Sequence, residues 1–233
     1  TEANRLRALK ELAVDFDKGG FVDKAIETYK DVLKINRDQY QVIQSLCRIY
    51  ENIEDWDGAY NYRIMLSKVA HENQAETISH ILVQKAKKHL NNGDICKCSE
   101  DLEDAFRFAP SVSAKILQLR LNLFSGDLEQ SKFLLLELLK EHPMYASFIF
   151  ESLSEGVTTE NQQDKKDYQQ RLTLIREFFL EIDDSELLNS HSVILSKVRL
   201  LKSYGKSDQA LVIINKWLRE NENPTEVMKA EYI

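Results

Sequence analysis

A short pattern recurs five times along this chain of 233 residues, and two of the steps between neighbouring copies are 34 and 33 residues long. In four places a glycine precedes a small residue by five positions, as in "GFVDKA" and "GDLEQS". A fifth copy has Glu54 in place of the glycine, and its small residue, Ala59, follows Ala25 by 34 residues. A period of this length is typical of stacked supersecondary units, so it restricts the fold more than any other feature.

The residue types in this pattern suit two helices joined by a tight turn. A glycine ends a helix where the backbone needs a positive φ, and a small residue lets two helices cross closely. A proline stops the second helix before the next unit begins. The glycines are Gly20, Gly93, Gly126 and Gly205. The small residues are Ala25, Ala59, Cys98, Ser131 and Ala210, and the prolines are Pro110, Pro143 and Pro224.

This period and these residue types resemble the tetratricopeptide repeat, a helix-turn-helix unit of about 34 residues. The resemblance implies an all-α fold, an α-solenoid whose repeats form a right-handed superhelix. It predicts a single array over residues 1–233, with repeats at about 6–39, 40–73, 79–111, 112–143 and 191–224. Repeat two lacks the glycine, and repeat four has Lys115 and Gln118 where bulky apolar residues are usual.

Residues 144–190 depart from the repeat. The pattern predicts a helix in "MYASFIFESLSEGV", a polar loop over 154–164 and a longer amphipathic helix in "DKKDYQQRLTLIREFFLEI". Two interpretations stay open: a degenerate repeat that packs as an ordinary helical pair, or a surface for docking or dimerisation. The second is kept open by four aromatic residues, more than one hairpin face needs: Phe148, Phe150, Phe178 and Phe179.

The segment "GDICKCSEDL" contains a Cys-x-Cys pair that raises the question of a metal or redox site. Aligned with "GDLEQSKFLL", it places Cys98 in the small position and Cys96 in the first turn of the second helix. Residues two apart on a helix point about 200° away from each other, so these thiolates cannot bind one ion together. We expect a buried, structural Cys98, and no metal or cofactor in this chain.

No enzyme motif is present in the sequence. The five histidines are scattered without the spacing of a metal site, and neither a Gly-x-Ser-x-Gly motif nor a phosphate-binding loop occurs. We therefore predict a protein that is not an enzyme. The net charge of −7, with acidic and basic residues interspersed, has the wrong sign for bulk binding of nucleic acid.

Composition also bears on the compartment. Three cysteines do not make a disulfide framework, so we expect a reducing environment. The sequence has neither an apolar run long enough to span a membrane nor a signal peptide, and it opens without methionine.

In a stacked array the first helix of each repeat lines a concave groove. The ninth position of the five repeats is Val14, Arg48, Lys87, Arg120 and Arg199, so four of five are basic in a negatively charged chain. These residues are either ordinary solvated surface or a stripe that pairs with acidic side chains or a free carboxylate of a partner. Val14 departs from the carboxylate clamp of chaperone-binding relatives, which has Asn there. The candidate protein-binding residues are Arg48, Lys87, Arg120, Arg199, Gln44, His80 and Asn91.

Three stretches carry a closer resemblance: "FVDKAIETYKDVLK", "LCRIYENIEDWDGAYNYRIMLSKV" and "ISHILVQKAKKHLNNGDICKCSEDLEDAFRFAPSVSAKI". They resemble the bacterial lipopolysaccharide assembly protein B family over most of 6–150 and more weakly over 191–224. The resemblance implies a cytoplasmic scaffold, tethered to the inner membrane by an N-terminal helix and followed by a C-terminal rubredoxin-like metal domain. It also implies an adaptor that links the committed-step deacetylase of lipopolysaccharide synthesis to a membrane protease. Neither the helix nor the four-cysteine module is in this sequence, so we expect the middle of a longer protein.

The sequence thus predicts a non-enzymatic adaptor that binds proteins at the cytoplasmic face of the inner membrane and regulates lipopolysaccharide synthesis. The alternative is an assembly scaffold of the secretion, pilus or cell-division type, a homodimer formed through residues 144–190. In both cases the expected partners are proteins, with no nucleic acid and no direct membrane span in this chain.

Overall fold

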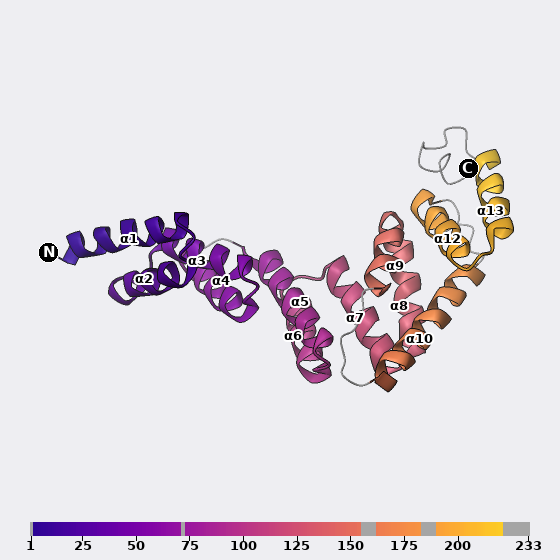
Figure 1. The fold of residues 1–233 in the computed structure, drawn as a ribbon, viewed down its shortest axis with the longest axis horizontal. Coiled ribbons are helices and arrows are strands. Elements are labelled where there is room, and N and C mark those ends of the chain that lie inside the picture. Colours follow the sequence, from indigo (N-terminus) through magenta and orange to yellow (C-terminus); the bar gives the residue numbers. More distant parts are fainter. Residues whose placement is uncertain (1, 71–72, 155–161, 183–189, 221–233) are drawn as a thin grey trace. The chain divides into compact units, whose positions relative to one another are not determined.

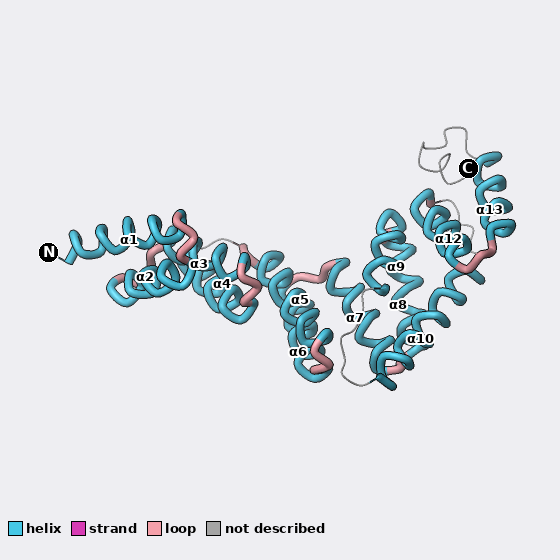
Figure 2. The backbone as a smooth tube through the Cα atoms, in the orientation of Figure 1, coloured by secondary structure: helices cyan, strands magenta, loops and turns pink. Residues whose placement is uncertain are grey.

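The computed structural model describes residues 2–70, 73–154, 162–182 and 190–220, and in these ranges the chain is helical and has no strand (Figure 1, Figure 2). The first helices are α1 (Glu2–Lys18), α2 (Val22–Ile35), α3 (Tyr40–Asn52), α4 (Trp56–Ala70), α5 (Ala75–Asn91) and α6 (Ile95–Phe108). The later helices are α7 (Val112–Ser125), α8 (Leu128–Glu141), the 3₁₀ helix η1 (Pro143–Tyr145), α9 (Ala146–Ser154), α10 (Gln162–Glu181), α12 (His191–Ser203) and α13 (Ser207–Glu220).

The chain forms two compact units. The first comprises Thr1–Lys87 and Glu100–Pro110, and the second comprises Lys88–Ser99 and Ser111–Ile233. In the first unit α1 packs on α2, α2 on α3, and α3 on α4. In the second unit α7 packs on α8 and α12 on α13, while α9 and α10 pack on α7 and α12. The fold is all-α and built from tetratricopeptide-type helix pairs, as the period predicts.

The same kind of turn joins the two consecutive helices of five pairs, α1–α2, α3–α4, α5–α6, α7–α8 and α12–α13. At each turn a backbone amide donates to the carbonyl five residues earlier over 2.9–3.0 Å, which is the Schellman hydrogen bond. The bonded pairs are Phe21 to Phe16, Asp55 to Tyr50, Asp94 to His89, Asp127 to Asn122 and Lys206 to Leu201. The residue just before each donor has positive φ, and four of these residues are the predicted glycines, with φ between +70° and +89°.

The turn of repeat two keeps this geometry without glycine. Glu54 has φ +56° and is the one non-glycine residue with positive φ in the described ranges. The left-handed conformation places a Cβ too close to the backbone, so Glu54 is strained where the glycines are not. The sequence departure in repeat two is therefore a change of residue within an unchanged turn.

The predicted small residues lie where they were expected. Their exposed fractions are 0% for Ala25, Ala59, Cys98 and Ser131 and 1% for Ala210. Close helix crossings leave no room for larger side chains at such positions. The prolines fit as well, because α6 and α8 each end two residues before Pro110 and Pro143. Pro224 lies outside the described residues. Helix α5 begins at Ala75, four residues before the predicted start of repeat three.

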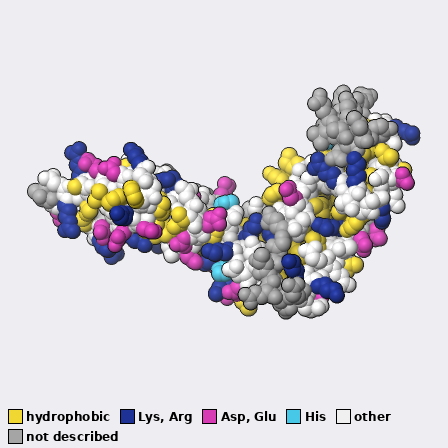
Figure 3. All heavy atoms as spheres, in the orientation of Figure 1, with side chains coloured by type: hydrophobic (Ala, Val, Ile, Leu, Met, Phe, Trp, Pro, Cys, Tyr) yellow, Lys and Arg dark blue, Asp and Glu magenta, His cyan; other side chains and the backbone are white. Residues whose placement is uncertain are grey.

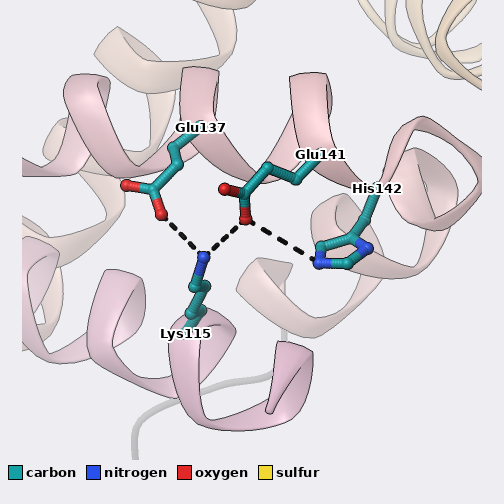
Figure 4. A network of polar contacts seen from close by, with 4 residues as sticks. All are labelled: Lys115, Glu137, Glu141 and His142. Carbon is teal, nitrogen blue, oxygen red and sulfur yellow. Dashed lines mark hydrogen bonds and ion pairs between the residues drawn. The ribbon is translucent and has the colours of Figure 1, made fainter. Parts of the chain in front are cut away.

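Repeat four compensates for its polar residue with an ion-pair bridge (Figure 4). Lys115 of α7 places its Nζ 2.6 Å from Glu137 Oε1 and 2.6 Å from Glu141 Oε2, both on α8. Glu141 Oε2 also lies 3.9 Å from His142 Nε2. The hydrogen bonds that Lys115 donates to Glu137 and Glu141 raise the pKa of Lys115, and the bond that Glu141 accepts lowers the pKa of Glu141. Lys115 therefore joins two helices by charge where an apolar residue would join them by packing.

Helices α9 and α10 occupy the atypical 144–190 region, and most of the loop predicted at 154–164 lies outside the described residues. Phe179 is fully buried, and its ring centroid lies 4.3 Å from that of Phe150. Phe150 and Phe178 are partly buried against the same core, and only Phe148 is exposed, at 49%. Most of the aromatic excess in this region therefore belongs to the core of the second unit.

Helix α10 is fixed to its neighbours by polar contacts as well. The Arg171 guanidinium donates to the carbonyls of Leu123 and Phe124 at 3.1 and 2.6 Å, which satisfies the C-terminal end of α7. The Tyr168 hydroxyl donates to the Leu153 carbonyl of α9 at 3.0 Å. These contacts hold α7, α9 and α10 together, and this arrangement determines the accessibility of α7.

None of the helices in the described ranges has the length and apolar character of a membrane span.

Candidate functional site

The first unit contains part of the predicted basic stripe. Arg48 lies on α3 with a side chain that is 54% exposed, and it forms an ion pair with Asp17 of α1. Gln44 lies one turn earlier on the same helix and is exposed. On α5, His80 is exposed and Lys87 is half-buried, while Asn91, also half-buried, belongs to the second unit. Arg48 is thus accessible, with its charge already partly engaged within the chain.

Arg120 requires a correction, because its side chain is buried, with 2% exposed. In a regular array this position of a first helix faces the groove. Here α7 packs against α8, α9 and α10, and residues on all sides of the helix are buried. A helix covered on every face has no groove side, so Arg120 is not part of an exposed stripe.

Arg199 of α12 is exposed and lines a pocket of about 520 Å³ within the second unit. Three helices form this pocket, which we name the α9–α10–α12 pocket. Helix α9 contributes Ser147, Phe150, Glu151 and Ser154; α10 contributes Arg176; and α12 contributes Ser196, Arg199, Leu200 and Ser203. Two guanidinium groups, one carboxylate and four hydroxyls therefore surround one cavity.

The polar groups of this pocket are organised by local hydrogen bonds. The Ser147 and Ser196 hydroxyl oxygens lie 3.0 Å apart, and Arg176 donates to the Ser154 hydroxyl. Three serine hydroxyls donate to carbonyls of their own helices: Ser154 to Phe150 (2.8 Å), Ser196 to Ser192 (2.8 Å) and Ser203 to Leu200 (2.7 Å). Because these protons are already donated, the three hydroxyls can act toward a ligand only as acceptors, while the guanidinium groups supply the donors.

Sequence reasoning missed most of this pocket, although a signal was present. The segments "SFIFESLS" and "SKVRLLKS" each place serines seven residues apart, at Ser147 and Ser154 and at Ser196 and Ser203. Residues at i, i+3, i+4 and i+7 share one helix face, and the pocket residues of α9 and α12 have this spacing. The sequence alone did not indicate that these two faces lie opposite each other.

The first unit has a basic pocket of its own, of about 510 Å³, between α2 and α4. Its lining residues are Lys30, Leu33, Lys34, Arg37, Tyr62 and Met65. Lys34 pairs with Asp31 at 2.7 Å, and a hydrogen bond with the Tyr50 hydroxyl raises the pKa of Lys30. On the face that Figure 3 draws, acidic and basic side chains are interspersed. On this face charge therefore singles out no region, and the pockets are the more specific features.

The cysteines do not form a site. Cys96 is exposed and Cys98 is buried, in agreement with the predicted separation of the two thiols. Burial raises the pKa of the Cys47 thiol to about 11, so this thiol is protonated and unreactive at neutral pH. No group of three or more His, Cys, Asp or Glu side chains in the described ranges could hold a metal ion.

Comparison with known proteins supports the resemblance noted in the sequence. The chain is similar to lipopolysaccharide assembly protein B of Haemophilus influenzae, with 25% identity over 211 residues, which covers 89% of this chain and 50% of that protein. The protein of the same name in Escherichia coli K12 is 24% identical over 95 residues, 41% of this chain and 24% of that protein. The chain thus spans at most about half the length of the relatives it matches. No protein-family profile matches it.

Solved structures give a weaker similarity. A tetratricopeptide repeat protein from Parabacteroides merdae aligns with 97% of this chain and 82% of its own, with 14% identity and a TM-score of 0.42. PilW, a type IV pilus biogenesis factor, aligns with 97% of both chains, with 13% identity and a TM-score of 0.37. At these low TM-scores, the repeat fold rests on the recurring turns and the buried small residues of the chain itself.

Proposed function

We propose that this chain is a protein-binding scaffold without catalytic activity, acting as an adaptor in the regulation of lipopolysaccharide synthesis. The observation that carries the proposal is the similarity to lipopolysaccharide assembly protein B over 89% of the chain. The helix-pair fold supports it, because stacked pairs offer extended surfaces to proteins.

In this proposal the adaptor brings a biosynthetic enzyme, the committed-step deacetylase, to a membrane protease at the cytoplasmic face of the inner membrane. The repeats supply the contact surfaces. Membrane tethering and metal binding, as in the family that the sequence resembles, belong to modules other than the residues described. The exposed Arg48 and the half-buried Lys87 remain candidates for the contact with the enzyme.

The test is the binding of the purified deacetylase of the same organism to the immobilised chain, measured by biolayer interferometry. Arg48→Gln with Lys87→Gln should weaken the binding, while Arg5→Gln with Lys68→Gln, an equal charge change at exposed positions, should not. Arg120 is left unchanged, since a polar substitution at a buried arginine would destabilise the second unit. If the wild-type chain binds neither the deacetylase nor the protease, the adaptor function is refuted.

A second candidate, a scaffold that dimerises through 144–190, is favoured by one observation. Three large apolar side chains near the start of α9 are exposed: Met144 at 71%, Tyr145 at 42% and Phe148 at 49%. Sedimentation equilibrium tests this candidate, with a dimer in the wild type and a monomer in Phe148→Asp as the expected results. Phe178 is unsuitable for substitution because it packs on the core. A wild-type chain that stays monomeric as its concentration rises would exclude the dimer.

A further inference from the structure

We propose that the α9–α10–α12 pocket binds an acidic peptide segment of a partner protein, with a carboxylate held between Arg176 and Arg199. The inference rests on the proposed function in assuming that the ligands of this chain are proteins. It adds a specific site and a chemical class of ligand.

The two arginines give the pocket its preference for an anion. Arg176 comes from α10 and Arg199 from α12, so two helices converge on the same cavity of about 520 Å³. In the described ranges no carboxylate pairs with Arg176, whose guanidinium donates only to the Ser154 hydroxyl. A guanidinium group has five N–H donors in a planar fork that matches a carboxylate. Glu151 offsets one of the two positive charges, so the pocket keeps a net charge of one.

The serine hydroxyls favour a peptide over a simple anion as the ligand of this pocket. Because Ser154, Ser196 and Ser203 donate their protons to helix carbonyls, they can offer a ligand only the lone pairs of their oxygens. The oxygens of Ser154 and Ser196 already accept one hydrogen bond each, from Arg176 and Ser147, and each keeps one lone pair. Sulfate offers these oxygens no donor and phosphate offers only its P–OH groups, so a simple anion meets their lone pairs less favourably than a peptide does. A peptide carries both partners, since its side-chain carboxylate accepts from the arginines and its backbone N–H groups donate to the hydroxyls.

The remaining lining residues suit a peptide as well. Phe150 and Leu200 supply apolar surface on α9 and α12, next to the polar groups. Glu151 of α9 and Arg199 of α12 both line the pocket, so a bound segment meets both signs of charge. An acidic residue flanked by apolar residues matches this combination, whereas a uniformly charged polyanion does not.

The experiment uses a short fluorescein-labelled peptide of alternating glutamate and leucine, titrated with the whole chain and followed by fluorescence polarisation. A matched peptide with glutamine for glutamate reports on the carboxylate. We expect the acidic peptide to bind, and binding to weaken as NaCl is added. Arg176→Gln with Arg199→Gln should lower the affinity at least about tenfold, because charge-assisted hydrogen bonds are lost.

The matched control is Lys216→Gln with Arg219→Gln, which removes the same charge from exposed positions of α13 outside the pocket. Circular dichroism checks that each variant is folded. Because Arg176 also contacts Ser154, Arg199→Gln alone serves as a second variant at an exposed site, and it should lower the affinity without affecting the fold.

Three results would overturn the proposal: unchanged binding by Arg199→Gln and the double variant, equal binding of the glutamine peptide, or displacement of the acidic peptide by an equal concentration of inorganic phosphate. The last result would indicate a simple anion site. These results leave the adaptor itself intact, because it is tested by deacetylase binding to the wild-type chain. If the chain binds the acidic peptide but neither protein partner, the adaptor function is refuted and the proposed peptide binding by the pocket is supported.

Discussion

The strained turn of repeat two yields the sharpest stability prediction. Glu54 adopts φ +56° at a position where the other four turns have glycine, and its side chain is exposed and has no hydrogen bond or ion pair in the described ranges. Glu54→Gly therefore removes strain without removing a contact. Gly205→Ala is the reciprocal change, since the added Cβ at φ +70° meets no atom within 4 Å and introduces only the backbone penalty.

The magnitude follows from two opposing terms. A left-handed conformation costs a residue with a Cβ roughly 1–2 kcal/mol. Glycine loses about 0.5–1 kcal/mol more conformational entropy on folding than alanine does. Glu54→Gly should therefore raise the free energy of unfolding of the first unit by about 0.5–1 kcal/mol, and Gly205→Ala should lower that of the second unit by a similar amount.

Urea denaturation followed by far-ultraviolet circular dichroism measures both changes, with an expected midpoint shift of about 0.3 M in opposite directions. Glu54→Ala is the control, because it removes the side chain and keeps the strain, and its midpoint should stay near that of the wild type. If Glu54→Gly leaves the midpoint unchanged or lowers it, the turn of repeat two is not strained and the reasoning fails.

Three further predictions concern packing, thiol accessibility and charge. Gly58→Ala should destabilise the first unit by about 1–3 kcal/mol in the same urea assay, because the new Cβ would lie 2.3 Å from the Tyr50 ring; an unchanged midpoint would show that the ring moves freely. Ellman's reagent at neutral pH should modify one thiol per native chain, Cys96, and three per unfolded chain, because the other two cysteines are buried; rapid modification of more than one native thiol would contradict this burial. Lys115→Gln should lower the free energy of unfolding at neutral pH, and the difference between the variant and the wild type should shrink in acid. The reason is that Lys115 lowers the pKa of Glu141 in the folded chain. The stabilisation by this ion pair is therefore present above the ordinary glutamate pKa and is lost as the pH falls through the lowered pKa of the folded state. A difference that stays constant from neutral pH to acid would rule out the charge bridge.

The repeat geometry could be predicted from the sequence because it is local. A positive φ needs glycine and a close helix crossing needs a small residue, and these requirements recur at each turn. The structure places the predicted glycines at the turns and the predicted small residues at the crossings. Gly20 and Ala25 in the first pair, and Gly205 and Ala210 in the last, are examples. Even the exception, Glu54, occupies the same turn as the glycines.

The surface was harder to predict because exposure depends on helices distant in sequence. Arg120 has the position of a groove residue, yet α9 and α10 pack against its helix and its side chain is buried. Phe178 and Phe179 looked like excess surface aromatics and pack against the core instead. The α9–α10–α12 pocket depends on α9 and α12 lying together, and the serine spacing within each helix does not specify this contact.

The most direct test of the adaptor is the formation of a ternary complex. The chain, the purified deacetylase and the soluble domain of the membrane protease are mixed and analysed by size-exclusion chromatography with light scattering. The adaptor predicts one complex containing all three proteins, with no association of enzyme and protease when the chain is left out. Three separate peaks, or an enzyme and a protease that associate equally well without the chain, would contradict it.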